Sequence, residues 1–99
     1  MTNLTVFATY RLDPANEEAF VELFPEHEAV LRRHDLLDTA PPRIYRQQTD
    51  EGVTFVEIFD WRPNLDQTPG DIPEVAAIWH RMIRLCTSVD FPHYARWNA

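Results

Sequence analysis

The sequence contains few of the residues that most often indicate a particular chemistry. There is one cysteine, Cys86, so no disulfide can form within the chain and nothing indicates an oxidising compartment. The two glycines, Gly52 and Gly70, are too few and too far apart for a glycine-rich phosphate loop. No Ser–His–Asp order, nucleophile elbow or HExxH pattern is present. The sequence therefore carries no motif for phosphate binding, serine hydrolysis or zinc proteolysis.

Lysine is also absent, and the nine basic residues are all arginine, against sixteen acidic residues. The formal net charge of −7 repels a phosphate backbone and an anionic membrane surface, so we expect neither nucleic acid nor a membrane as a partner. The N-terminal "MTNLTVFATYRL" has no basic segment, and its apolar run is short and interrupted by threonine. These features predict a cytoplasmic protein.

At 99 residues, of which 44% are hydrophobic and 12% aromatic, the chain suits one domain spanning residues 1–99 with its own core. Hydrophobic periodicity predicts four strands and two helices. Strands are expected at 4–12, 43–48, 53–61 and 91–97, and helices at 14–34, with a kink or break near Pro25, and at 71–86 after an Asp71–Glu74 capping box. The order β-α-β-β-α-β predicts an α+β, ferredoxin-like sandwich: a four-stranded antiparallel sheet with both helices on one face.

The stretch "VTFVEIFDW" decides how the sheet is oriented. We expect its helix-facing side to combine Val6, Ala8 and Tyr10 with Val56 and Ile58. The opposite side would then carry Thr5, Phe7, Thr9, Arg11, Phe55, Glu57, Phe59 and Trp61, joined by Arg43 and Tyr45 if the hairpin register turns Ile44 toward the helices. So many aromatic side chains would not remain exposed, so a homodimer through the sheet faces is expected, with Glu57 and Arg11 marking a cavity.

The layout over nearly the whole chain, the "VTFVEIFDW" strand and the following "PEVAAIWHRM" helix resemble the dimeric α+β-barrel superfamily, and within it antibiotic-biosynthesis-monooxygenase-like (ABM-like) domains. The resemblance implies a homodimer with a small-molecule pocket between sheet and helices in each subunit. Haem-degrading members pair a first-strand Asn with a Trp and a helical His, whereas this first strand has Thr5 and Thr9. We expect no cofactor and no metal.

Two residues are the predicted catalytic groups, Glu57 and His80, either of which could remove a proton from a phenol-like substrate. Two arginines, Arg11 and Arg43, could hold the developing oxyanion. The expected substrate-binding set is completed by Phe7, Tyr45, Phe55, Phe59, Trp61, Trp79 and His27. Because His27 and His34 lie seven residues apart on one helical face, a metal site including Glu57 is a weaker alternative.

Three functions fit this pattern. The first is an enzyme resembling a cofactor-independent monooxygenase that acts on a small aromatic or hydrophobic compound. The second is a ligand-binding or structural dimer without turnover, because a binding pocket and a catalytic pocket share most of their lining. The third is an RNA-recognition module, which Glu51, Val53 and the negative charge oppose.

Overall fold

The computed structural model describes residues 4–97. Its elements, in chain order, are β1 (Leu4–Leu12), the 3-10 turn η1 (Pro14–Asn16), α1 (Glu17–Val21), α2 (Leu23–Arg33), β2 (Arg43–Thr49), β3 (Gly52–Asp60), the 3-10 turn η2 (Pro69–Asp71), α3 (Pro73–Arg84), β4 (Ser88–Asp90) and β5 (His93–Ala95). The strand predicted at 91–97 is shorter, because only β5 lies within that range, and β4 precedes it as a strand that was not predicted. Pro92 lies between them and cannot donate a ladder hydrogen bond, which explains the interruption.

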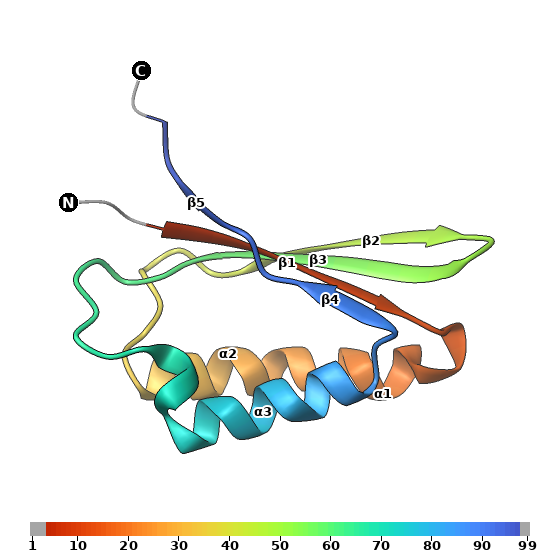
Figure 1. Ribbon diagram of the computed structural model, residues 1–99, viewed down its shortest axis with the longest axis horizontal. Coiled ribbons are helices and arrows are strands. Elements are labelled where there is room, and N and C mark those ends of the chain that lie inside the picture. Colours follow the sequence, from red (N-terminus) through yellow and green to blue (C-terminus); the bar gives the residue numbers. More distant parts are fainter. Residues whose placement is uncertain (1–3, 98–99) are drawn as a thin grey trace.

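The strands form one antiparallel sheet in the order β2-β3-β1-β4, with β5 pairing to the other end of β1. Figure 1 shows α1, α2 and α3 together on one side of this sheet, while β5 continues away from the helices. The predicted ferredoxin-like α+β architecture is confirmed. Within residues 4–97, no helix is long and apolar enough to cross a membrane.

The expected orientation of β3 is wrong. The β1–β3 register places Val6 opposite Phe59, Ala8 opposite Glu57 and Tyr10 opposite Phe55, so these six residues share the helix-facing side. Residues Phe55, Glu57, Phe59 and Trp61 are accordingly buried beneath the helices, whereas Val56 and Ile58 are on the open face with Thr5, Phe7, Thr9 and Arg11. The β2–β3 register pairs Ile44 with Glu57, and therefore leaves Arg43 and Tyr45 on the open face, as predicted for that hairpin.

The first helical segment breaks at Glu22, three residues before Pro25. Pro25 has no N–H to donate to the carbonyl of Val21, the residue at which α1 ends, so the missing bond falls at the junction of two abutting helices. The break orients α2 so that it buries His27, Val30 and Leu31 against the sheet.

The Asp71–Glu74 capping box is not formed. Helix α3 begins after Ile72, with Pro73 in its first turn and no side-chain cap. Glu74 instead accepts hydrogen bonds from Arg33 (2.6 Å) and lies 2.7 Å from Nε2 of His34, which ties the end of α2 to the start of α3. These contacts fix the two helices that carry the functional side chains described below.

Candidate functional site

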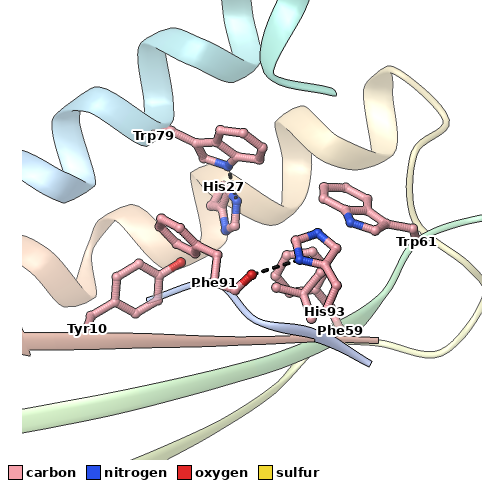
Figure 2. Close-up of a pocket in the computed structure, with 8 residues that line it drawn as sticks. Tyr10, His27, Phe59, Trp61, Trp79, Phe91 and His93 are labelled. Carbon is pink, nitrogen blue, oxygen red and sulfur yellow. Dashed lines mark hydrogen bonds between the residues drawn. The ribbon is translucent and has the colours of Figure 1, made fainter. Parts of the chain in front are cut away.

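A cavity of about 230 Å³ lies between the sheet and the helices. It is lined by Val6, Tyr10, His27, Phe59, Trp61, Trp79, Phe91 and His93 (Figure 2). Most of these side chains are aromatic, and they come from β1, α2, β3, α3 and the C-terminal segment. The cavity is smaller than the roughly 300–1,000 Å³ of sites for drug-sized ligands, and therefore suits a molecule of one or two rings.

A chain of hydrogen bonds runs through the wall of this cavity. The indole Nε1–H of Trp79 donates to Nε2 of His27 over 2.8 Å (Figure 2). Nδ1 of His27 lies 3.1 Å from one carboxylate oxygen of Glu57, and the Tyr10 hydroxyl donates to the other oxygen over 2.9 Å. His27 and Glu57 are each only 1% exposed, so the chain joins two helices to the central strands inside the core.

The hydrogen-bond partners define which nitrogen of His27 carries a proton. An indole N–H can only donate, so Nε2 of His27 must be the acceptor in this contact. The proton of the neutral ring is therefore on Nδ1, from which it is donated to Glu57. This arrangement, in which a carboxylate orients a histidine whose other nitrogen is basic, is the one used by general-base histidines.

Burial raises the pKa of Tyr10 well above its usual value of 10, and the Glu57 carboxylate adds to the rise. The Tyr10 hydroxyl thus remains a hydrogen-bond donor across the physiological range and does not act as a base. Burial also raises the pKa of the Cys86 thiol to about 11, and its Sγ lies 3.3 Å from the carbonyl of Met82.

These two shifts predict a loss of stability at alkaline pH. Below about pH 10 Tyr10 is protonated in both the folded and the unfolded chain. As the pH rises further, the unfolded chain releases this proton first, so the free energy of unfolding should fall; Cys86 contributes in the same direction above about pH 9. Urea unfolding of wild type and Tyr10→Phe at pH 8 and pH 11 measures how much of the fall in the free energy of unfolding is due to Tyr10. Equal pH dependence in the two proteins would contradict the assignment.

The outer part of the cavity is formed by the chain after β4. Phe91 stacks on Trp79, with ring centroids 6.4 Å apart and planes at 19°, and His93 stacks on Trp61 at 6.4 Å and 27°. Nδ1 of His93 lies 2.7 Å from the carbonyl oxygen of Phe91. Sequence reasoning missed His93 and Phe91 as site residues. The signal that could have found them is the aromatic-rich "FPHY" at a strand expected to lie beside β1.

The structure separates the other predicted site residues into three places. His27, Phe59, Trp61 and Trp79 line the cavity, and Glu57 lies directly behind His27. Phe55 is buried deeper in the core, against Phe20 and Phe24. Arg11, Arg43, Tyr45 and Phe7 are on the open face, away from the cavity.

His80 is exposed on α3 and is not part of the cavity lining. One residue along a helix is a rotation of about 100°, and it is the preceding residue, Trp79, that turns inward. His27 and His34 contact different partners, Glu57 and Glu74 respectively. Within residues 4–97, no group of three or more His, Cys, Asp or Glu side chains is arranged to hold a metal ion.

The open face of the sheet is amphipathic, which corrects the expectation of a strongly aromatic surface. A broad hollow there is lined by Thr5, Phe7, Thr9, Arg43, Val56, Pro92, Tyr94, Ala95 and Arg96. Tyr45 and Tyr94 are 56% and 57% exposed, and Arg11 forms an ion pair with Asp90 at 3.0 Å. Threonines and arginines alternate with the apolar side chains on this face.

Comparison with known proteins finds relatives by structure alone. No family model matches the sequence, and no curated protein matches it. Three solved structures match with high similarity of fold. Rv0793 from Mycobacterium tuberculosis has 19% identity over 98% of this chain and 97% of its own, with a TM-score of 0.73. A conserved protein from Methanosarcina mazei Go1 has 16% identity over 95% and 92%, with a TM-score of 0.69.

The third structure is described as a "putative antibiotic biosynthesis monooxygenase" from Caulobacter crescentus CB15. It is 16% identical over 98% of this chain and 92% of its own, with a TM-score of 0.68. At sequence identities of 16–19%, the similarity to these structures shows a shared fold and nothing more specific. The resemblance inferred from the sequence is confirmed at the level of the fold: the chain shares its ferredoxin-like α+β fold with these structures, one of which is described as a putative antibiotic biosynthesis monooxygenase.

Proposed function

We propose that the cavity binds a small, flat, hydroxylated aromatic compound, and that the protein oxygenates it without a cofactor. The observation that carries this proposal is the Trp79–His27–Glu57–Tyr10 hydrogen-bond chain in the wall of an otherwise apolar, aromatic cavity. Aromatic side chains stack on a flat ring, and a histidine held by a buried carboxylate is suited to accept a proton. The fold shared with the Caulobacter crescentus protein supports the same reading.

In the proposed reaction, Nε2 of His27 is the base. The substrate hydroxyl takes the place of the Trp79 indole at this nitrogen and transfers its proton there. Glu57 acts as a positioning residue, because it holds the proton of His27 on Nδ1 and stabilises the imidazolium that forms. The predicted roles are thereby partly reassigned: Glu57 keeps a part in proton transfer through His27, and the part given to His80 passes to His27.

The steps that follow balance without an added reductant. Loss of the proton makes the ring electron-rich, and a ring carbon attacks molecular oxygen to form a C–O bond. The peroxide regains the proton from His27, and loss of one water molecule yields a quinone. For 1,5-dihydroxynaphthalene, one hydroxyl of which is deprotonated while the other is not used in the reaction, the sum is one substrate and one O₂ giving 5-hydroxy-1,4-naphthoquinone and one water.

We further propose that a second copy of the chain covers the open sheet face. Phe7, Val56, Ile58, Tyr45 and Tyr94 offer apolar area there, and Phe7 and Tyr94 pack edge to face at 5.3 Å. A domain of this size leaves a large share of its surface unburied, which favours association. In such a dimer the cavities would remain separate, because each lies on the helix side of its own sheet.

A second candidate function is ligand binding without turnover. The observation in its favour is that Nε2 of His27 is already paired with Trp79, so a ligand could fill the cavity without ever reaching the base. Oxygen uptake separates the two candidates: the enzyme consumes one O₂ per quinone, whereas a binding protein consumes none.

The test is oxygen uptake and naphthoquinone absorbance with 1,5-dihydroxynaphthalene, for wild type and His27→Gln. Glutamine can still donate to Glu57 and accept from Trp79 but is no base, so the fold and ligand binding should persist while turnover falls at least about 100-fold. His80→Gln is the matched control and should keep the wild-type rate. Full activity in His27→Gln would refute the role of His27, and lost activity in His80→Gln would restore the prediction made from the sequence.

A further inference from the structure

At the outer part of the cavity, His93 offers a hydrogen-bond acceptor that the protein itself does not use. A carbonyl oxygen only accepts, so Nδ1 of His93 is the nitrogen that donates to Phe91, at 2.7 Å (Figure 2). In the neutral ring Nε2 is then an acceptor, and within residues 4–97 it makes no hydrogen bond. His93 lines the cavity and is exposed on the short strand β5, so this nitrogen is accessible to a ligand.

Trp61 offers the complementary donor beside it. Its indole N–H also has no hydrogen-bond partner in the described part of the chain. No buried side-chain N or O atom there lacks a partner, so this nitrogen is open to solvent and to a ligand. The Trp61 and His93 rings lie nearly parallel, with centroids 6.4 Å apart, so the rings that carry the donor and the acceptor are neighbours at one end of the cavity. At the inner end every polar side-chain atom is already engaged, because Tyr10, His27 and Trp79 bond to one another and to Glu57.

We propose that His93 and Trp61 form a recognition site for one hydroxyl group of the ligand. A hydroxyl is both donor and acceptor, and can therefore donate to Nε2 of His93 while accepting from the indole N–H of Trp61. The oxygen of a ketone or an ether only accepts, so it can accept from the indole N–H of Trp61 but has no proton to donate to His93. The inference rests on the proposed binding of an aromatic compound and adds two residues that determine which compound is held.

Recognition at this end also orients the ligand. With one hydroxyl between His93 and Trp61, the ring extends into the space between Phe59 and the stacked pair Trp79 and Phe91 (Figure 2). The opposite edge of the ring then faces His27, the proposed base. The site therefore favours aromatic compounds with a hydroxyl at each end, one held by His93 and Trp61 and the other placed to transfer its proton to His27.

A matched pair of ligands isolates the His93 contact. The probes are 1-naphthol and 1-methoxynaphthalene, since the ether keeps the oxygen that Trp61 would use but has no proton for His93. Isothermal titration calorimetry of the wild-type protein should show about 3–10-fold tighter binding of 1-naphthol, the effect of one net hydrogen bond. His93→Phe keeps a ring against Trp61 and should bind both ligands equally.

Three further variants complete the test. His80→Phe makes the same substitution outside the cavity and should still bind 1-naphthol more tightly than 1-methoxynaphthalene. In His93→Gln the amide oxygen can accept a hydrogen bond, so part of the preference for 1-naphthol over 1-methoxynaphthalene should return. Trp61→Phe should weaken the binding of both ligands but keep that preference. A preference that survives in His93→Phe, or wild-type binding of both ligands with equal affinity, would overturn the inference but leave the aromatic cavity. Failure of the wild-type protein to bind either ligand would overturn both the inference and the proposed function.

Discussion

Replacing Glu57 with alanine should lower the free energy of unfolding by about 2–6 kcal/mol. The carboxylate is 1% exposed and accepts from the Tyr10 hydroxyl and from Nδ1 of His27. Its removal leaves two buried donors without an acceptor, and each such group costs about 1–3 kcal/mol. Urea unfolding followed by circular dichroism measures the loss. The same change also frees the His27 ring, so proton transfer should be lost even where the fold survives.

A control and a double mutant sharpen this prediction. Glu51→Ala, at an exposed glutamate of the same hairpin, should change stability by no more than about 0.5 kcal/mol. In Glu57→Gln the side-chain amide nitrogen is itself a donor, and it would face the Tyr10 hydroxyl or Nδ1 of His27, which also donate. Tyr10→Phe removes one of these two donors. The double mutant Glu57→Gln/Tyr10→Phe should consequently cost less than the sum of the single changes. Additive losses would mean that Tyr10 and Glu57 are not coupled.

Replacing Phe20 with alanine should cost about 3–5 kcal/mol, the range for truncating a fully buried phenylalanine. Phe20 is 0% exposed, and its ring lies 4.9 Å from Tyr10, 5.1 Å from Phe24 and 5.7 Å from Phe55, measured between centroids. This aromatic cluster fixes the short helix α1 and holds Tyr10 beside Glu57. Thermal unfolding measures the change.

The same helix provides the comparison. Val21 is 42% exposed, so Val21→Ala should change stability by less than about 1 kcal/mol. Equal losses in the two variants would show that α1 is held by something other than the Phe20 cluster. If Phe20→Ala folds, it should also bind 1-naphthol more weakly, since Tyr10 lines the cavity.

The fold was predictable because it depends on periodicity. The alternation in β1 and β3, the turn at "TDEG" and the helical spacing after Pro14 and Pro73 are local patterns, and the structure has elements at these places. Element ends were less predictable. Asp71 and Glu74 have the spacing of a capping box, yet Glu74 bonds to Arg33 and His34, which a local pattern cannot reveal.

The two faces of β3 could not be assigned from the sequence for a physical reason. Both sides of "VTFVEIFDW" are largely apolar, and Glu57 made one of them look unsuitable for the core. A buried carboxylate is stable only when donors surround it. Those donors are Tyr10 and His27, 47 and 30 residues away in the chain, and their convergence is a property of the folded structure.

The site was only partly predictable for the same reason. Aromatic residues on β3 and α3 indicated a cavity, and His27, Phe59, Trp61 and Trp79 do line it. The choice between Trp79 and His80 depended on the rotation of α3, which packing determines. His93 enters the cavity only because β5 pairs with the start of β1, with Val6 opposite His93.

The proposed function requires that the cavity around Trp79 and His27 receives an aromatic ligand. The most direct measurement is a titration of ¹⁵N-labelled protein with 1-naphthol, followed through the indole N–H signals of its three tryptophans. Trp61 and Trp79 line the cavity, so their signals should shift together and saturate, while Trp97, which is 87% exposed, should not move. Unchanged Trp61 and Trp79 signals, or shifts confined to Trp97, would show that the cavity does not bind the ligand.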